Sequence, residues 1–210
     1  MKKPPFFASA WHYPSALGAL SGARRIHSPP QLEGARMLVL WGGEDISPAI
    51  YGQKAVKAHS GDIPSRRDMC EVTLAHAAVK MGIPILGICR GAQLLCALGG
   101  GSLYQHVDNH AGPNHDMIVG HEVIETNSVH HQMMITTEEM EVIGYTPARS
   151  PLKWLDQSDP ITNKDAEPEV VYIPKMKALC VQGHPEWLGN RHHLVKLVKL
   201  LCGEKFNVEI

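Results

Sequence analysis

The strongest chemical signature in the sequence is a cysteine between two glycines. Cys89 lies in PILGICRGAQ at 84–93, with Gly87 before it and Gly91 after it. An apolar run precedes the cysteine and an apolar segment follows, as in a nucleophile elbow with cysteine in place of serine. The turn would lift the thiol above a sheet edge, where the amino end of the following helix favours the thiolate. Taken alone, the motif also fits a buried, unreactive thiol.

A second motif, VQGHPEW at 181–187, supplies the groups that a thiol nucleophile needs. The imidazole of His184 would protonate a departing amine and later deprotonate the water that hydrolyses a thioester. Glu186 can hold this imidazole in one tautomer, as the third member of a triad does. Because the sequence has 13 histidines, the position of His184 after an apolar run is what singles it out.

Backbone amides complete the predicted reaction site. Gly42 and Gly43 follow the apolar run RMLVLW, and a backbone without side chains can approach a substrate oxygen closely. Together with the amide of Arg90, the amides of this Gly-Gly pair would form an oxyanion hole. A Gly-Gly pair after a strand is also a common turn.

The elements that position these motifs are short apolar runs at 36–41, 83–88 and 178–181. Such runs are typical of strands that are buried on both faces of a parallel sheet. The segment 65–81 has the apolar spacing of an amphipathic helix, so a strand, a helix and a strand form a βαβ unit. We also expect helices at 93–98 and 191–201, strands at 122–126 and 170–173, and a polar loop or crossover at 150–168.

Composition indicates one domain, 1–210, with a sizeable core. The formal net charge of −1 gives no field that would attract nucleic acid or an anionic membrane, so we expect a small-molecule substrate. Prolines, His12 and Tyr13 interrupt what would be the apolar part of a signal peptide. Five cysteines without paired spacing argue against a disulfide scaffold or a structural zinc site. A cytoplasmic location is expected.

These motifs occur together and in order, and they resemble those of the class I glutamine amidotransferases. The closest resemblance is to the γ-glutamyl-γ-aminobutyrate hydrolase family, peptidase family C26. The matching segments are GGEDISPAIYG at 42–52, RRDMCE at 66–71, GICRGAQ at 87–93, GGGSLYQ at 99–105, NSVHHQ at 127–132 and QGHPEW at 182–187. GICRGAQ with a downstream HPE is specific to the superfamily, and RRD and NSVHHQ narrow the match to the hydrolase branch.

The resemblance implies a flavodoxin-like three-layer α/β sandwich with a mostly parallel central sheet. It implies Cys89 as nucleophile, His184 as base and Glu186 as its partner, with the oxyanion hole at the amides of Gly43 and Arg90. Three further residues would lie near the α-amino and α-carboxylate groups of a γ-glutamyl unit: Gln93, Ser128 and His130. The reaction would pass through a γ-glutamyl thioester and needs no cofactor.

The sequence departs from the family in two places. The first 35 residues match poorly, and NSVHHQ follows a single strand-like segment where the family has a longer stretch. Loops at the carboxyl edge of such a sheet form the pocket rim, so the side that holds the leaving amine is expected to differ. Three functions stay open: a free-standing γ-glutamyl amide hydrolase, a glutaminase subunit that supplies ammonia to a separate synthase, and a silent relative that binds or regulates.

Two other groups of residues are assigned structural roles. Arg67 and Glu71 have the i, i+4 spacing of a surface ion pair on a helix. Four histidines crowd the region 106–121 but lack the fixed spacing of HExxH or of paired cysteines, so no metal site is expected.

Overall fold

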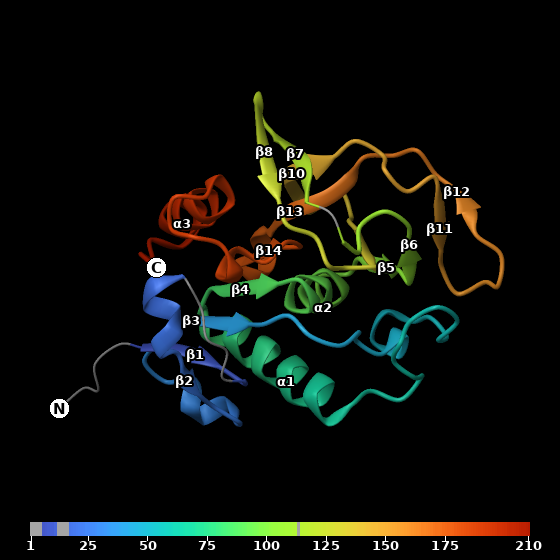
Figure 1. Ribbon diagram of the computed structural model, residues 1–210. Coiled ribbons are helices and arrows are strands. Elements are labelled where there is room, and N and C mark those ends of the chain that lie inside the picture. Colours follow the sequence, from blue (N-terminus) through green and yellow to red (C-terminus); the bar gives the residue numbers. More distant parts are fainter. Residues whose placement is uncertain (1–5, 12–16, 113) are drawn as a thin grey trace.

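A mixed sheet forms the centre of the computed structural model (Figure 1). Its strands lie in the order β2-β1-β3-β4-β14-β13-β10-β7-β8. The structure describes residues 6–11, 17–112 and 114–210. The strands of this sheet in chain order are β1 (Phe6–Ser9), β2 (Arg24–Arg25), β3 (Ala35–Leu40), β4 (Ile85–Ile88), β7 (His115–Val119), β8 (Glu122–Thr126), β10 (Glu141–Thr146), β13 (Glu167–Ile173) and β14 (Ala178–Val181). Two small sheets pair β5 (Ser102–Tyr104) with β9 (Met133–Ile135), and β11 (Leu152–Trp154) with β6 (His106–Val107) and β12 (Ile161–Thr162).

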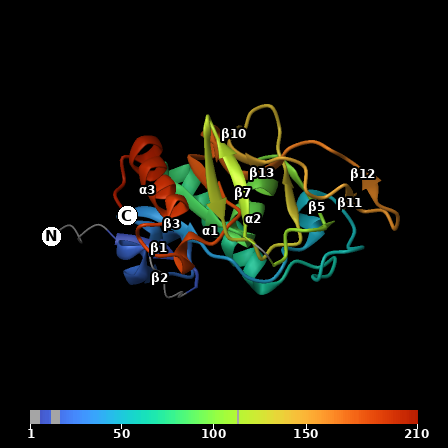
Figure 2. The ribbon, with the colours of Figure 1, turned by 45° about the horizontal axis from the view of Figure 1, so that its top comes forward.

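The sheet divides at β14 into a parallel and an antiparallel part. From β2 to β14 every neighbouring pair is parallel. From β14 to β8 every pair is antiparallel. Figure 2 shows β7, β10 and β13 side by side, away from β1 and β2. The motifs that carry Cys89 and His184 both leave the parallel part, at its carboxyl edge.

Helices cover both faces of the parallel part. The helices are α1 (Arg66–Met81), α2 (Arg90–Leu98) and α3 (His193–Phe206). Leu38 and Leu40 of β3 pack in the cluster that contains apolar residues of α1 and α2, while Met37 and Val39 pack in the cluster that contains those of α3. Figure 1 shows α3 and α1 on opposite sides of β3 and β4. This alternation confirms the expected three-layer α/β fold, and it explains why both faces of these strands are apolar.

Local sequence signals define α1. Ser65 accepts a hydrogen bond from the amide of Asp68, whose carboxylate accepts one from the amide of Ser65, so the two form a capping box. The helix ends at Gly82, with φ of 69°, where a left-handed conformation favours glycine. The expected βαβ unit is confirmed, because β3 and β4 are parallel neighbours that α1 connects.

Two sequence-based expectations were wrong. The stretch before NSVHHQ contains two strands, β7 and β8, which form an antiparallel hairpin where a single strand was expected. The polar segment 150–168 holds the short strands β11 and β12 and the start of β13. Both views place β11 and β12 at the end of the molecule away from the N-terminus (Figures 1 and 2).

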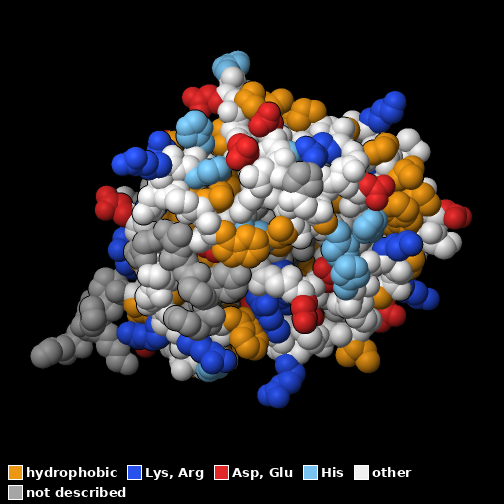
Figure 3. Space-filling model, in the orientation of Figure 1, with side chains coloured by type: hydrophobic (Ala, Val, Ile, Leu, Met, Phe, Trp, Pro, Cys, Tyr) orange, Lys and Arg blue, Asp and Glu red, His pale blue; other side chains and the backbone are white. Residues whose placement is uncertain are grey.

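The expectation that the N-terminal segment is no signal peptide falls partly on residues 1–5 and 12–16, which lie outside the described residues. Among the helices that the structure describes, none has the length and apolarity to cross a membrane. On the face in Figure 3, acidic and basic side chains are interspersed and several histidines lie close together.

Candidate active site

Cys89 occupies the sharp turn between β4 and α2. Its backbone has φ of 49° and ψ of −108°, a left-handed value of φ that is rare for a side chain-bearing residue. The flanking glycines are required by close packing. A Cβ on Gly87 would lie 2.6 Å from the carbonyl of Gly91, and one on Gly91 would lie 2.1 Å from the carbonyl oxygen of Leu40. The geometry is therefore that of the expected nucleophile elbow.

Cys89 is 7% exposed and lines a cavity. Burial raises its pKa to about 12, although a hydrogen bond from the backbone N–H of Arg90 acts in the opposite direction. Glu186 and Asp45 add a smaller electrostatic contribution that also raises the pKa. We expected the helix to favour the thiolate, but desolvation outweighs the amide and keeps the resting thiol protonated. Attack by sulfur at neutral pH therefore requires a base that takes the proton.

His184 follows β14 and is held from three sides. Its Nδ1 lies 2.7 Å from a carboxylate oxygen of Glu186, and its ring stacks on Trp187 with centroids 3.8 Å apart. Asn127 donates to the carbonyl of His184 and accepts from its amide, at 3.0 and 2.8 Å. In a neutral ring, a proton on Nδ1 directed at the carboxylate leaves Nε2 as the acceptor nitrogen, and Nε2 is buried with no hydrogen-bond partner. The imidazole is thus prepared to accept a proton through Nε2.

Gly42, directly after the end of β3 and Trp41, lies against both the thiol residue and the imidazole. A Cβ on Gly42 would lie 2.6 Å from Cε1 of His184 and 3.5 Å from Cβ of Cys89. The structure thus brings three motifs together because parallel neighbours β3, β4 and β14 end at the same edge of the sheet. Neither Gly42 as a spacer nor Trp187 as a stacking partner was singled out from the sequence. The HPEW spacing is the signal that could have indicated Trp187.

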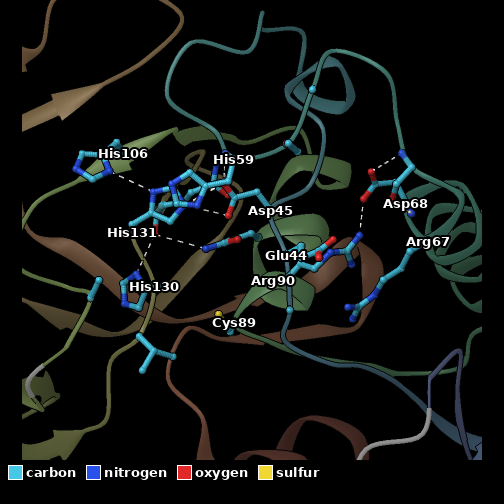
Figure 4. A pocket seen from close by; sticks show the side chains of 18 of the residues that line it. Glu44, Asp45, His59, Arg67, Asp68, Cys89, Arg90, His106, His130 and His131 are labelled. Atoms are coloured by element: carbon cyan, nitrogen blue, oxygen red, sulfur yellow. Dashed lines mark hydrogen bonds and ion pairs between the residues drawn. The ribbon is translucent and has the colours of Figure 1, made fainter.

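The cavity at this edge has a volume of about 850 Å³. Gly43, Arg90 and Gln93 line it together with Cys89 and His130. His184 and Glu186 are buried and do not line it, and neither does Ser128, whose hydroxyl donates to the carbonyl of His110. In Figure 4 the sulfur of Cys89 lies between His130 on one side and the side chains of Arg67 and Arg90 on the other.

Gln93 and His130, two residues implied as substrate contacts, meet near the backbone of Gln132. The amide nitrogen of Gln93 approaches the carbonyl of Gln132 at 3.5 Å and the side-chain oxygen of Gln182 at 3.4 Å. Nδ1 of His130 lies 2.9 Å from the same carbonyl of Gln132. Both side chains are buried at the cavity wall, whereas Ser128 is directed into the backbone behind it.

A buried ionic network supports the side of the cavity that Arg90 lines. The guanidinium of Arg90 forms ion pairs with both Asp68 and Glu71 of α1, and all three side chains are buried. The expected pair of Arg67 with Glu71 is present at 3.0 Å, but Glu71 is 1% exposed, so this is no surface pair. Nη2 of Arg67 also donates to the carbonyls of Trp41 and Gly42, at 2.9 and 3.0 Å. The RRDMCE motif therefore holds the turn at 41–43.

A group of histidines lies at the cavity rim. Nε2 of His131 lies 3.0 Å from the carboxylate of Asp45, which also accepts from the amide of His59. The rings of His59 and His131 stack with centroids 4.0 Å apart, and Nδ1 of His106 lies 3.2 Å from Nδ1 of His131. Burial acts to raise the pKa of Asp45, but the bonds from His131 and His59 outweigh it and lower the pKa. Asp45, His59 and His131 have the donor atoms to hold a cation.

A second histidine group is fully buried behind the cavity wall. It comprises His110, His115 and His130 around Glu169, with Glu167 beside His110. Burial acts to raise the pKa values of both glutamates, but the facing imidazoles, chiefly His110 at Glu167 and His115 at Glu169, lower each to about 2. His110, His130 and Glu169 also offer donor atoms that could hold a metal ion. The expectation of no metal site rested on sequence spacing, and these donors come from distant segments.

Comparison with protein families gives a match to the Peptidase C26 model over residues 26–142. A Schizosaccharomyces pombe protein, named provisionally as a glutamine amidotransferase, is 36% identical over 53% of this chain and 51% of its own length. The glutamine amidotransferase-like protein YvdE of Lactococcus lactis is 30% identical over 77% of this chain and 70% of that protein. The γ-glutamyl-γ-aminobutyrate hydrolase of Escherichia coli O157:H7 is 38% identical over 29% of this chain and 23% of that protein. The chain thus spans about half the length of the first of these relatives.

Solved structures share the fold. A glutamine amidotransferase from Methylobacillus flagellatus superposes with a TM-score of 0.59, at 15% identity, over 97% of this chain and 76% of that one. The glutaminase domain of Trypanosoma brucei CTPS, solved with bound acivicin, gives a TM-score of 0.58 at 12% identity over 97% of this chain and 94% of that one. At sequence identities this low, the similarity to these structures establishes a shared fold and nothing further.

Proposed function

This chain belongs to the peptidase C26 family, and from that premise we propose that it is a cysteine-dependent hydrolase of γ-glutamyl amides, including glutamine. The observation that carries the proposal is the contact of Gly42 with both Cys89 and His184, beside a cavity that the thiol lines. A nucleophile, a base oriented by a carboxylate and backbone amides at one sheet edge are the parts that acyl transfer requires.

In the proposed reaction, Nε2 of His184 takes the thiol proton while the sulfur of Cys89 attacks the side-chain carbonyl of the substrate. The carbonyl oxygen becomes an oxyanion that accepts hydrogen bonds from the amides of Gly43 and Arg90. When the C–N bond breaks, the imidazolium protonates the amine, which leaves a γ-glutamyl thioester. Water then attacks the thioester and gives a proton to His184; the C–S bond breaks, glutamate is released, and the imidazolium returns the proton to the sulfur of Cys89. Glu186 stabilises the imidazolium in both steps.

The raised pKa of Cys89 is consistent with this order of events. A thiol with a pKa of about 12 is protected from adventitious electrophiles in the resting enzyme. We propose that substrate in the cavity allows transfer of the proton to the buried Nε2 of His184, so that charge forms only where the oxyanion amides and Glu186 can stabilise it.

Gln93 and His130 line the cavity next to Cys89, and we propose that they lie near the α-amino and α-carboxylate groups of the glutamyl unit. Ser128 would act through the backbone of His110, because its hydroxyl is bonded there. The histidines at the rim would then border the leaving amine.

A glutaminase subunit that supplies ammonia to a separate synthase is the second candidate. The observation in its favour is the likeness to the glutaminase domain of CTPS, whose fold this chain covers almost entirely. In that case glutamine would be the substrate and a partner protein would receive the ammonia. A silent binding protein is the weaker alternative, because it gives no role to the orientation of His184 by Glu186.

Steady-state turnover of glutamine and of γ-glutamyl-γ-aminobutyrate by the purified chain tests the proposal. We expect release of glutamate from at least one substrate without a partner. His184→Ala should lower kcat by several orders of magnitude, while Glu186→Gln should cost less because Glu186 only orients and stabilises the imidazole. Parent-like activity of His184→Ala would refute the mechanism. Glutamine turnover that appears only with a synthase added would select the subunit.

A further inference from the structure

Three buried acceptor atoms face one another behind the cavity wall. They belong to His110, in the loop after β6, to His130, before β9, and to Glu169, in β13. Nδ1 of His110, Nε2 of His130 and one carboxylate oxygen of Glu169 are buried without a hydrogen-bond partner. Because buried polar atoms are nearly always paired in proteins, three such atoms in one place require an explanation.

The outer contacts of both imidazoles determine which nitrogen carries the proton. Nδ1 of His130 faces the carbonyl of Gln132 at 2.9 Å, and a carbonyl can only accept, so Nδ1 must be the donor. Nε2 of His110 faces the carboxylate of Glu167 at 2.6 Å and donates to it in the same way. In their neutral forms the two rings therefore direct unprotonated nitrogens at the Glu169 carboxylate, which is itself an acceptor.

The distances suit a small cation between these atoms. Nδ1 of His110 lies 3.4 Å and Nε2 of His130 lies 3.8 Å from Oε1 of Glu169, the oxygen that His115 also contacts. Oε2 of the same carboxylate has no hydrogen-bond partner and is the oxygen free to bind an ion. Zinc bound to nitrogen at about 2.0–2.1 Å in a tetrahedron separates its ligands by roughly 3.4 Å, so small side-chain shifts would complete the geometry. All three donor atoms already lie within 4.8 Å of one another.

The charges of the cluster also call for a cation. Glu167 has Lys153 as a partner at 3.1 Å, whereas the groups that face Glu169 among the described residues are imidazoles, which carry no fixed charge. Glu169 is 1% exposed, and a buried carboxylate is costly unless its charge is balanced. A single bound ion would satisfy the carboxylate and both nitrogens at once.

We propose that His110, His130 and Glu169 bind one divalent transition-metal ion, for which Zn²⁺ has the best-matched ligand preference. Two imidazole nitrogens and one carboxylate form a His₂Glu set with a fourth position for water, and nitrogen donors disfavour Ca²⁺ and Mg²⁺. The surroundings are those of a metal site, since Glu167 orients His110 and the carbonyl of Gln132 orients His130. Nε2 of His115, 2.9 Å from Glu169, orients the carboxylate.

The ion would tie three separate segments together at the back of the cavity. His130 lines the cavity with Cys89, so the ion would fix one wall of the substrate site without touching the reacting atoms. This inference does not depend on the proposed amide hydrolysis, in which no ion takes part.

Metal binding to the purified full chain tests the site directly. After removal of metal with a chelator, titration with Co²⁺ and Zn²⁺ should show one equivalent bound, with the intense visible absorption of four-coordinate Co²⁺ and a Tm that rises on Zn²⁺ addition. Glu167→Gln removes only an outer partner and should weaken the affinity about 10- to 100-fold. His110→Gln and Glu169→Gln remove ligands and should weaken it further.

Two variants serve as controls. His121→Gln changes an exposed histidine outside the cluster, and His59→Gln disrupts the alternative donor group at the rim. Both should keep one bound equivalent. Because substitution of Glu169 can also impair folding, the parent chain carries the test by itself: absence of a stoichiometric ion in the parent would overturn the proposal. Loss of the ion in His59→Gln with retention in Glu167→Gln and His110→Gln would overturn it as well.

Discussion

Nη2 of Arg67 and the carbonyl oxygen of Gly42 form a hydrogen bond of 3.0 Å. The peptide between Gly42 and Gly43 is trans, so its N–H points opposite to its C=O. Arg67 therefore turns the N–H of Gly43 away from itself, and we expect this amide to face the Cys89 side. A Cβ on Gly43 would lie 2.3 Å from Nη1 of Arg67, which shows how closely the guanidinium covers this turn.

If Arg67 positions the oxyanion amide, Arg67→Met should lower kcat more than it changes KM. The oxyanion exists only in the transition state, and loss of one donor costs about 10²–10³-fold, so a misplaced donor should cost at least about 10-fold. Arg66→Met is the matched control, because Arg66 precedes Arg67 on the same helix and its side chain is exposed. A parent-like kcat in Arg67→Met, with an unchanged Tm, would show that the turn is positioned without Arg67.

Gly42→Ala tests the contact between the thiol residue and the imidazole. The added methyl would meet Cε1 of His184 at 2.6 Å, so the ring must move and its alignment with Cys89 should be lost. We expect a fall in kcat of at least about 100-fold, as for a misplaced catalytic group. Gly61→Ala, also at the cavity but with nothing within 4 Å of its Cβ, should keep most activity. Equal kinetics of the two variants would contradict the assignment.

The identity of the nucleophile is testable by substitution and by labelling. Cys89→Ala and Cys89→Ser should abolish turnover, while Cys96→Ala should keep most of it because Cys96 is buried away from the cavity. Simple iodoacetamide is a poor probe, since Cys70 is more exposed than Cys89. An electrophilic glutamine analogue is the better reagent. Mass spectrometry that finds its adduct first on Cys70, Cys96, Cys180 or Cys202 would exclude Cys89 as the nucleophile.

Buried thiols predict a loss of stability at alkaline pH. Burial raises the pKa values of Cys96 and Cys202 to about 12, above the ordinary value near 9. Between these values the unfolded thiols lose protons and the folded ones do not. The contribution of these thiols to the free energy of unfolding is thus fully present below about pH 9. Above that pH it falls by up to about 1.4 kcal/mol per pH unit for each thiol. The free energy of unfolding, measured with urea at a series of pH values above 9, should fall less steeply with pH for Cys202→Ala than for the parent. Equal pH dependence of the two proteins would disprove the prediction.

The fold and the reaction motifs could be predicted from the sequence because their signals are local. The glycines around Cys89 and the apolar run before it specify a strand, a turn and a helix within ten residues. The carboxyl ends of neighbouring parallel strands then lie at one edge of the sheet, regardless of the length of the segments that connect them.

The buried histidine cluster could not be predicted in this way. His115 and Glu169 bond across 54 sequence positions, and His110 and Glu167 across 57. Strand β7 was missed for a related reason, since His115 occupies a core-facing position where the pattern requires an apolar residue. The pKa of Cys89 also depends on burial, which the motif does not encode. Polar groups that satisfy one another in the core break the periodicity on which sequence prediction relies.

Substrate selectivity should reside on the glutamyl half. An acyl-transfer enzyme holds this half through amide cleavage and thioester hydrolysis, but it releases the amine after the first step, so binding energy is useful mainly on the acyl side. Gln93 and His130 are buried and held by Gln132 and Gln182, as a rigid recognition surface requires, whereas the rim near His59 is partly exposed. We therefore expect a strict requirement for a free α-amino and α-carboxylate group and a loose choice of amine.

A panel of γ-glutamyl amides, matched α-glutamyl amides and N-acetylated forms measures this selectivity. The γ-glutamyl amides should share kcat/KM values within about one order of magnitude, while α-linked and acetylated forms, which leave buried polar groups unpaired, should fall by about 10⁴-fold or more. His59→Gln should change the ranking of amines and leave the α-against-γ preference intact, and Gln93→Leu should reduce that preference. Comparable kcat/KM for α- and γ-linked substrates would refute the recognition model. Absence of cleavage of every γ-glutamyl amide without an added partner would favour the ammonia-supplying subunit.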